Sequence, residues 1–261
     1  MTVRTSADRS HRGQTSPAPE PVLAPGAPPY TLLSCSMSID GYLDDATEQR
    51  LLLSNRADFE RVDAVRARCD AILVGARTVR RDDPRLLVRS RARRHEREAR
   101  GLPGSPMKVT VTRRGDLDPA AQFFVAGDVP KLIYCASPAL ARVRARLSPA
   151  ATVVDAGEPV DLCRVMSDLR ARGVERLMVE GGGMVHTQLL TAGLADELQL
   201  VIAPIFVGDS RAPRFVRDGG FPWGPDRRAT LAEVRQIGDV VLLRYALSDR
   251  YDPYDPGPGA A

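Results

Sequence analysis

VEGGGMVHTQLL (residues 179–190) begins as an apolar strand, ends that strand in a glutamate, and runs through three glycines into a helix. Glycines make the unfolded chain looser and the fold harder to stabilise. A glycine-rich turn that opens a helix, however, exposes backbone N–H groups and the positive end of the helix dipole, which suits a phosphate or pyrophosphate. The spacing matches neither the Rossmann turn nor a phosphate loop with its lysine. A tight turn that only packs helix on strand is the alternative interpretation.

Outward from this stretch, apolar strands alternate with amphipathic helices. Strands are predicted within 30–41, 71–75, 108–112, 131–136, 151–156, 176–182 and 196–206, helices within 54–70, 137–147, 159–173 and 183–193, and a hairpin over 229–247 that turns near Gly238. This alternation predicts an α/β sandwich with a mostly parallel sheet and an antiparallel C-terminal edge. Ligands of such sheets lie beyond the carboxyl ends of the strands.

The composition sets broad limits on the protein class. The chain has 261 residues and a net charge of +4, which does not demand a nucleic-acid partner. Residues 1–29 are predicted to be a disordered Pro-rich leader, 30–248 the folded domain, and 249–261 a disordered tail. No run approaches the roughly 18 apolar residues of a membrane span, and the start lacks a secretory signal. The four separated cysteines indicate reduced thiols in the cytoplasm, and no metal site follows from them.

A second candidate ligand-binding stretch is GARTVRRDDPRLLVR (75–89), which begins at the end of a predicted strand. Thr78 lies early in a short helical turn that Pro84 ends, and Arg85 and Arg89 follow. Arginine binds phosphate through its planar fork, so a ligand-binding role is one interpretation. An ordinary charged loop is the other.

Several further features have plain structural explanations. Asp40 and Gly41 alone indicate only a turn, Arg66 is typical of an exposed helix face, and His186 is expected to pack inside its amphipathic helix. The basic cluster RSRARRHEREARG (89–101) is typical of a solvated loop or short helix, with a polyanion contact as the sharper alternative. It lacks interleaved aromatic residues and any nucleic-acid motif.

Three motifs occur together in the order of one family: SMSIDG (36–41), ILVGARTVRRDDPRLLVR (72–89) and MVEGGGMVHTQLLTAGLADELQLVIAPIFVG (178–208). Over roughly residues 30–248 the sequence resembles the pyrimidine reductase of riboflavin biosynthesis, the C-terminal half of a bifunctional deaminase–reductase. The resemblance implies a dihydrofolate-reductase-like three-layer sandwich. It also implies an NADPH-dependent enzyme that reduces the ribosyl group of 5-amino-6-(5-phosphoribosylamino)uracil to ribityl, by hydride transfer to C1′.

The resemblance also implies roles for particular residues. Asp40, beside the nicotinamide, and Glu180 form the implied catalytic pair. The implied substrate contacts are Arg66, Leu86, Arg89 and Glu180, with the two arginines on the ribose phosphate. The implied cofactor contacts are Gly75, Thr78, Asp82, Thr112, Arg113, Gly181, Gly182, Gly183, Met184 and Val185.

The sequence departs from the family pattern in two respects. Many bifunctional members carry a lysine six residues before the Asp-Gly aspartate, where this chain has Ser34. The zinc-deaminase signature is also absent, so deamination is expected to come from another protein. Alternative substrates with the same fold and cofactor are therefore the 2,5-diaminopyrimidinone, dihydrofolate or a secondary metabolite. An NADPH-binding protein without turnover is the alternative from another class.

Two further expectations concern cofactor choice and assembly. VTVTRRGDL (109–117) places Thr112, Arg113 and Arg114 just past a strand, where positive charge would favour the extra phosphate of NADPH. Two solvated turn arginines are the alternative. In DELQLVIAPIFVG (196–208), apolar and polar residues alternate so little that both faces of the strand must be buried, which favours a homodimer.

Overall fold

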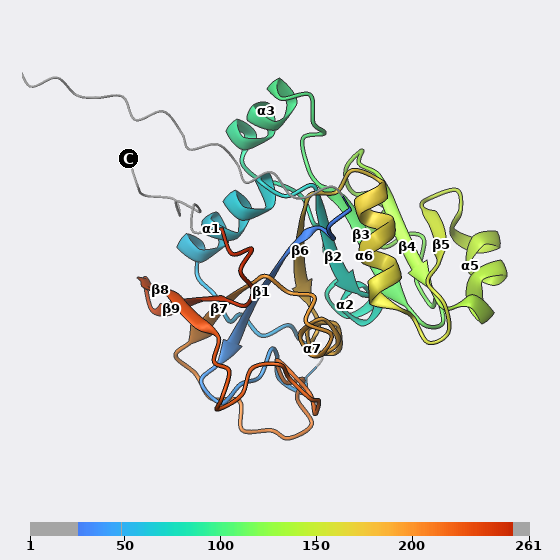
Figure 1. Cartoon of the computed structure of the whole chain (residues 1–261). Helices are drawn as coiled ribbons and strands as arrows, with labels where there is room; N and C mark the ends of the chain where they lie inside the picture. The colour runs from blue at the N-terminus through green and yellow to red at the C-terminus, as the bar shows by residue number, and fades with distance from the viewer. Residues whose placement is uncertain (1–25, 48, 253–261) are drawn as a thin grey trace, which may run out of the picture.

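One nine-stranded sheet organises residues 26–47 and 49–252, the part of the chain that the computed structural model describes (Figure 1). The strand order is β5-β4-β3-β2-β6-β1-β7-β9-β8. All neighbours pair in parallel from β5 to β7, whereas β9 pairs antiparallel with both β7 and β8. The strands are β1 (Tyr30–Ser38), β2 (Ala71–Gly75), β3 (Met107–Thr112), β4 (Lys131–Cys135), β5 (Thr152–Asp155), β6 (Arg176–Gly181), β7 (Glu197–Ala203), β8 (Thr230–Ile237) and β9 (Val240–Ala246).

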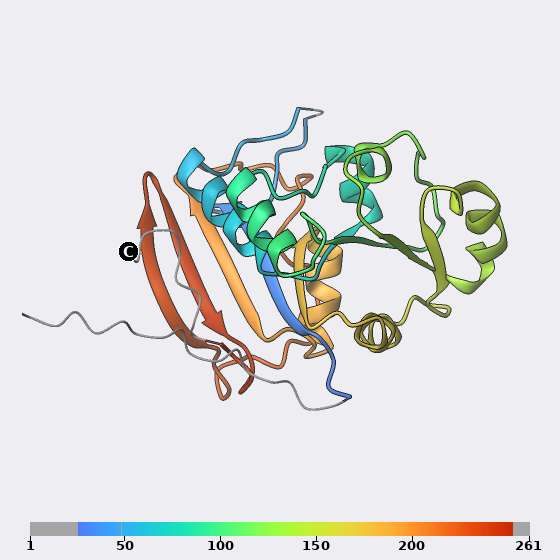
Figure 2. The same ribbon diagram turned by 90° about the horizontal axis from the view of Figure 1, so that it is seen from above.

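Helices cover both faces of the parallel part, which confirms the three-layer α/β sandwich. One apolar core lies between the sheet and the helices α6 and α7, and a second lies between the other face and α1, α2 and α5. Figure 2 shows the β8–β9 hairpin at one end of the sheet and β5 with α5 at the other. The helices are α1 (Arg56–Ala67), α2 (Ala76–Asp82), α3 (Arg91–Ala99), α4 (Gln122–Val125), the 3-10 turn η1 (Ser137–Ala139), α5 (Leu140–Leu147), α6 (Leu162–Ala171) and α7 (Gly183–Thr191).

Local caps set the observed helix starts. The Asn55 side chain accepts a hydrogen bond from the Asp58 N–H and begins α1. Asp161 has the same role in α6, where its carboxylate accepts from two N–H groups of the first turn. The predicted helix 159–173 therefore begins only after Asp161, while the other predicted strands and helices are confirmed within a few residues.

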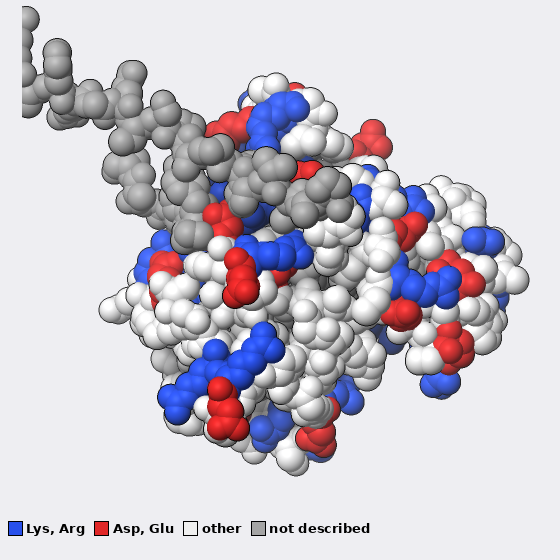
Figure 3. Space-filling view, viewed as in Figure 1, with Lys and Arg blue, Asp and Glu red and all other residues white. Residues whose placement is uncertain are grey.

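The basic cluster 89–101 forms the short helix α3, as one of its two interpretations predicted. Its arginines are largely committed to the protein itself. Arg97 is 3% exposed and donates to the carbonyl oxygens of Ala67 and Cys69 at 2.8 Å, which satisfies the end of α1. On the face that Figure 3 shows, basic and acidic side chains lie intermixed.

The chain ends differ in what the structure describes. The described part of the chain does not include residues 1–25 of the predicted leader or residues 253–261 of the predicted tail. The start of that tail packs on the domain, since Arg250 and Asp252 pair with Asp196 and Arg176 at 3.7 and 3.2 Å. No helix in the described part is long and apolar enough to cross a membrane.

Candidate active site

A cavity of about 1290 Å³ opens where the carboxyl ends of β2, β3 and β6 meet the helices α1, α2 and α7. Its volume exceeds the roughly 300–1,000 Å³ of a typical small-ligand pocket, so it has room for two ligands side by side. Every residue predicted for the site lines it except Asp40 and Gly181. The predicted residues that line it are Arg66, Gly75, Thr78, Asp82, Leu86, Arg89, Thr112, Arg113, Glu180, Gly182, Gly183, Met184 and Val185.

The three glycines that run from the end of β6 into the first turn of α7 are required for different structural reasons. Gly181 has φ +128°, which other residues rarely adopt, and the peptide bond to Gly182 is cis. A Cβ on Gly183 would overlap the carbonyl oxygen of Arg214, and one on Gly182 would come within 3.2 Å of the Thr78 hydroxyl oxygen. The packing interpretation of this run therefore holds for Gly183, while Gly182 keeps the cavity side of the turn open.

Glu180, at the tip of β6, forms a two-pronged ion pair with Arg66 of α1. The Nε and Nη2 atoms of Arg66 donate to its two carboxylate oxygens, each at 2.6 Å. The two side chains are only 13% and 15% exposed. Burial disfavours the charged guanidinium, but the adjacent carboxylate outweighs this effect and raises the pKa of Arg66. Arg66 also donates to the Leu87 carbonyl oxygen at 3.1 Å, so it is not a free surface cation.

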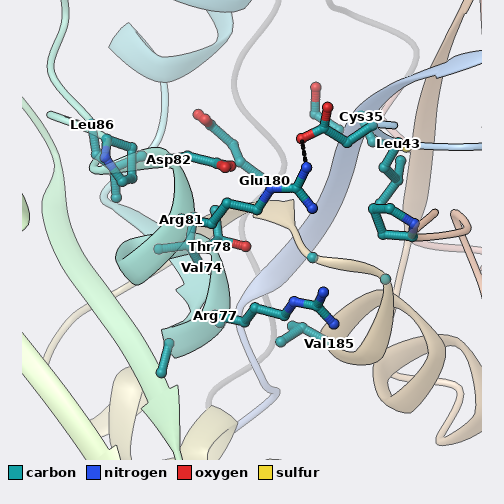
Figure 4. Close-up of a pocket in the computed structure, with 18 of the residues that line it drawn as sticks. Cys35, Leu43, Val74, Arg77, Thr78, Arg81, Asp82, Leu86, Glu180 and Val185 are labelled. Carbon is teal, nitrogen blue, oxygen red and sulfur yellow. Dashed lines mark ion pairs between the residues drawn. The ribbon is translucent and has the colours of Figure 1, made fainter. Parts of the chain in front are cut away.

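The helix α2 forms the opposite wall of the cavity and starts at Gly75. A Cβ on Gly75 would lie 3.0 Å from a methyl group of Val185, so this glycine lets α2 and α7 approach. Thr78, Asp82 and Leu86 lie along this wall, and Arg77 extends toward Val185 at the start of α7 (Figure 4). Burial raises the pKa of Asp82.

The rim beyond β3 is basic. Arg113 and Arg114 both line the cavity, and Arg113 lies 3.7 Å from the carboxylate of Glu158. These two side chains are 77% and 39% exposed, so the pair contributes little to stability. The hydroxyl oxygen of Thr112 accepts from the Gly115 N–H at 2.9 Å and shapes the turn that carries the arginines.

The structure does not bring Asp40 to the cavity. Its carboxylate accepts from the Ser38 hydroxyl at 2.5 Å and from the Val207 and Gly208 N–H groups. These donors, the hydroxyl first, hold the pKa of Asp40 at about 2. Asp40 therefore ties the end of β1 to the loop after β7, outside the cavity lining.

His186 lies behind the glycine turn as a core residue. It is fully buried, its ring lies 5.6 Å from that of Phe215, and burial lowers its pKa to about 4. This agrees with the packing role expected from its helix. Among the described residues, no group of His, Cys, Asp and Glu side chains is arranged to hold a metal ion.

Two cavity segments carried no usable sequence signal. Residues 50–54 and the loop residues Pro213, Arg214 and Arg217 line the cavity, yet neither belongs to a motif. Ser34 and Cys35 of β1 also line it, next to the strand that ends in Glu180. The late loop meets the site through the Arg214 carbonyl beside Gly183 and through the Arg217 N–H, which donates to the Thr187 hydroxyl oxygen at 2.9 Å, and these contacts have no local signature in the sequence.

A mostly parallel sheet with a glycine turn beside a large cavity defines the class, an α/β domain that binds its ligand at the carboxyl edge of the sheet. The family model of the RibD C-terminal domain matches residues 29–243. The chain belongs to this family, the reductases of riboflavin biosynthesis, which confirms the resemblance.

Two archaeal relatives are named 2,5-diamino-6-ribosylamino-4(3H)-pyrimidinone 5′-phosphate reductase. The one from Archaeoglobus fulgidus is 32% identical over 81% of this chain and 94% of its own length. The one from Methanothermobacter thermautotrophicus is 35% identical over 84% and 98%. A RibD protein of Bacillus amyloliquefaciens is 29% identical, and the match spans 60% of its length.

Solved structures share the fold. A pyrimidine reductase-like protein of Corynebacterium diphtheriae superposes with a TM-score of 0.70 at 22% identity, over 84% of this chain and 91% of that one. The deaminase–reductase of Thermotoga maritima gives a TM-score of 0.68 at 19% identity, over 84% of this chain and 56% of that one. The predicted dihydrofolate-reductase-like fold is confirmed.

Membership of a reductase family implies a nicotinamide cofactor, and the cavity fits one. The helix α7 points its N-terminal N–H groups at a turn that lacks side chains, which suits a pyrophosphate. Gly182, Gly183 and Val185 line this part of the cavity, with Thr78 opposite them. These residues would hold the cofactor, with the basic rim at its far end.

Proposed function

We propose that the protein is an NADPH-dependent reductase of a phosphorylated ribosylaminopyrimidine, converting its ribosyl group to ribityl. The observation that carries the proposal is the single cavity that joins the glycine turn to the Glu180–Arg66 pair. A bound nicotinamide cofactor would supply the hydride for C1′ of the opened sugar. The chain's own residues position the two partners and exclude water.

In this proposal Glu180 accepts hydrogen bonds from the sugar hydroxyls, held in place by Arg66. Arg66 has N–H groups beyond the three that the structure occupies, because a guanidinium carries five. It can therefore hold Glu180 and contact the substrate phosphate together with Arg89. Asp40 is not proposed as a group that touches the cofactor, since it does not line the cavity.

Between the two pyrimidines, we favour the 2,5-diaminopyrimidinone, the form before deamination. The relatives at 32% and 35% identity are named for that substrate, whereas the RibD relative reaches 29%. Ser34, 5% exposed in the cavity lining, also replaces the lysine of many bifunctional members. The deaminated uracil compound is the second candidate, favoured by the match to RibD proteins.

A cytoplasmic location is part of the proposal, supported by four free thiols.

The proposal is tested by cofactor oxidation with the diaminopyrimidinone phosphate, the uracil phosphate and dihydrofolate in parallel assays. We expect the first to give the highest kcat/KM, the second a lower value, and dihydrofolate none. KM for the dephosphorylated diaminopyrimidinone should be at least tenfold higher than KM for the phosphorylated form, since each charge-assisted contact to the phosphate contributes about 1.5–3 kcal/mol. Turnover of dihydrofolate alone would refute the proposed substrate class. If none of the three substrates is turned over, the protein would instead be a cofactor-binding protein.

Removal of one of the two rim arginines should reduce the preference for NADPH. Arg113 and Arg114 are the cations past β3, and one of them can fork onto the extra phosphate. We expect Arg113→Ala or Arg114→Ala to weaken NADPH binding about 10- to 100-fold, from a loss of about 1.5–3 kcal/mol, and to leave NADH binding unchanged. Fluorescence titration with both cofactors measures this.

Arg146→Ala is the control for that titration, because Arg146 is an exposed arginine of α5 outside the cavity lining. It should change neither affinity. Equal losses of NADPH and NADH in both rim variants would show that the preference arises elsewhere.

We also propose a homodimer, with a location different from the one that the sequence suggested. The strand β7 lies between β1 and β9, and its apolar side chains are buried within the chain. Among the described residues, one face of the β8–β9 hairpin is an uncovered apolar surface, where Leu231, Val234 and Val241 are 52%, 60% and 37% exposed. Paired register places Leu231 opposite Tyr245 and Val234 opposite Leu243 on that same face.

Val234→Lys should convert the dimer to a monomer in light scattering. A charge placed in a contiguous apolar contact leaves an uncompensated buried ion on association. Val125→Lys is the matched control, because Val125 is also 60% exposed but lies on α4, away from the hairpin. A wild-type monomer at micromolar concentration, or a dimer that survives Val234→Lys, would contradict the proposed interface.

A further inference from the structure

The wall of the cavity at residues 87–90 has no regular secondary structure, yet side chains hold its backbone. Arg66 donates to the Leu87 carbonyl oxygen at 3.1 Å, and the Ser105 hydroxyl oxygen accepts from the Val88 N–H at 3.0 Å. Arg94 donates to the Val88 and Arg89 carbonyl oxygens at 3.0 and 2.6 Å. A segment whose backbone is satisfied in this way is fixed in place before any ligand binds.

Asp63 is the centre of this arrangement. Its carboxylate is 2% exposed and accepts from the N–H groups of two consecutive residues, Arg89 and Ser90, the second at 3.1 Å. Arg93 of α3 neutralises it at 2.8 Å. This explains the basic character of α3, since two of its arginines fix the wall and its aspartate.

Three positions of α1 face this wall at helical spacing, namely 59, 63 and 66. Phe59 lies beneath the Arg89 guanidinium, 5.5 Å from ring centroid to the central carbon, and both residues line the cavity. One helix face therefore sets both the backbone and the side-chain direction of Arg89. Asp63 does not line the cavity, so it cannot contact a ligand there.

We propose that Asp63 is a positioning residue for substrate recognition, which holds Arg89 in the direction that meets the substrate phosphate. The inference rests on the proposed function, in which Arg89 contacts that phosphate. Asp63 acts through the backbone of residues 89 and 90, with Phe59 as the second support. It has no role in the hydride step itself.

The test compares steady-state kinetics of Asp63→Asn with phosphorylated and dephosphorylated diaminopyrimidinone. Asparagine keeps the shape but offers one acceptor instead of two. We expect KM for the phosphorylated substrate to rise about tenfold, kcat to stay within about twofold, and KM for the dephosphorylated substrate to stay unchanged. In an Arg89→Ala background, Asp63→Asn should add no further effect.

Asp70→Asn is the matched control, because the Asp70 carboxylate likewise accepts from two consecutive N–H groups, those of Glu175 and Arg176. Asp70 lies outside the cavity lining, so its variant should leave KM unchanged. If Asp63→Asn fails to fold, Asp63→Glu tests the same inference, since it keeps the charge and both acceptors but shifts them by one methylene, and it should raise KM for the phosphorylated substrate about threefold.

The inference is overturned if KM rises equally for both substrates, or if the effects of Asp63 and Arg89 add in full. A wild-type enzyme that does not distinguish the two substrates would instead refute the phosphate contact of the proposed function. The two failures are thus separate.

Discussion

Arg66→Ala is expected to lower kcat/KM by at least a hundredfold and to destabilise the fold. The Glu180 side chain is 15% exposed in the wild-type pair, and the variant removes the guanidinium that holds both its oxygens at 2.6 Å. Loss of one partner of a fully buried pair costs about 3–5 kcal/mol, and the partial exposure reduces this to about 2–3 kcal/mol. The cavity wall also loses its contact at Leu87. Urea unfolding and initial rates measure the two effects.

Two further variants separate the roles of Arg66. Arg66→Lys keeps the charge but loses the planar fork, so it should recover stability more than activity. The double variant Arg66→Met with Glu180→Gln removes both charges, so it should be more stable than Arg66→Ala and still inactive. If Arg66→Ala keeps wild-type stability and changes KM only for the phosphorylated substrate, then Arg66 serves only as a ligand of the phosphate.

Gly183→Ala is expected to abolish cofactor binding and to cost about 1–3 kcal/mol of stability. Its Cβ would overlap the Arg214 carbonyl oxygen, which is backbone and cannot rotate away. Relief requires the start of α7 or the 213–217 loop to move, and both line the cavity. Cofactor titration and thermal unfolding measure the effect. Gly182→Ala should be milder, because the Thr78 hydroxyl that it meets at 3.2 Å is a side chain.

Gly220→Ala is the matched control for this substitution. No atom lies within 4 Å of a Cβ added at Gly220, in the same long connection that carries Arg214. We expect its stability to stay within about 0.5 kcal/mol of wild type and its cofactor affinity to be unchanged. Normal cofactor affinity in Gly183→Ala would contradict the cofactor role of this glycine, and wild-type stability would contradict its packing role.

The local sequence was sufficient to predict the strands, most of the helices and several of the segments that line the cavity. The period of apolar residues located the strands and helices within a few residues, because that signal lies inside the elements themselves. The caps at Asn55 and Asp161 set the starts of α1 and α6 in the structure. The glycine run and the 75–89 stretch follow strands, and parallel strands bring their carboxyl ends to one edge. These two stretches therefore meet in one cavity.

Partners across the fold were decided only by the tertiary structure. Arg66 and Glu180 are 114 residues apart in sequence, and they meet because α1 packs over the sheet where β6 ends. The Arg214 carbonyl that requires Gly183, and the Asp63 carboxylate that holds residues 89 and 90, likewise come from distant segments. Asp40 stands in a family motif, yet its carboxylate satisfies the N–H groups of Val207 and Gly208. A residue type and its neighbours in sequence fix what a side chain can bind, whereas the packing of the sheet and helices determines which group lies within its reach.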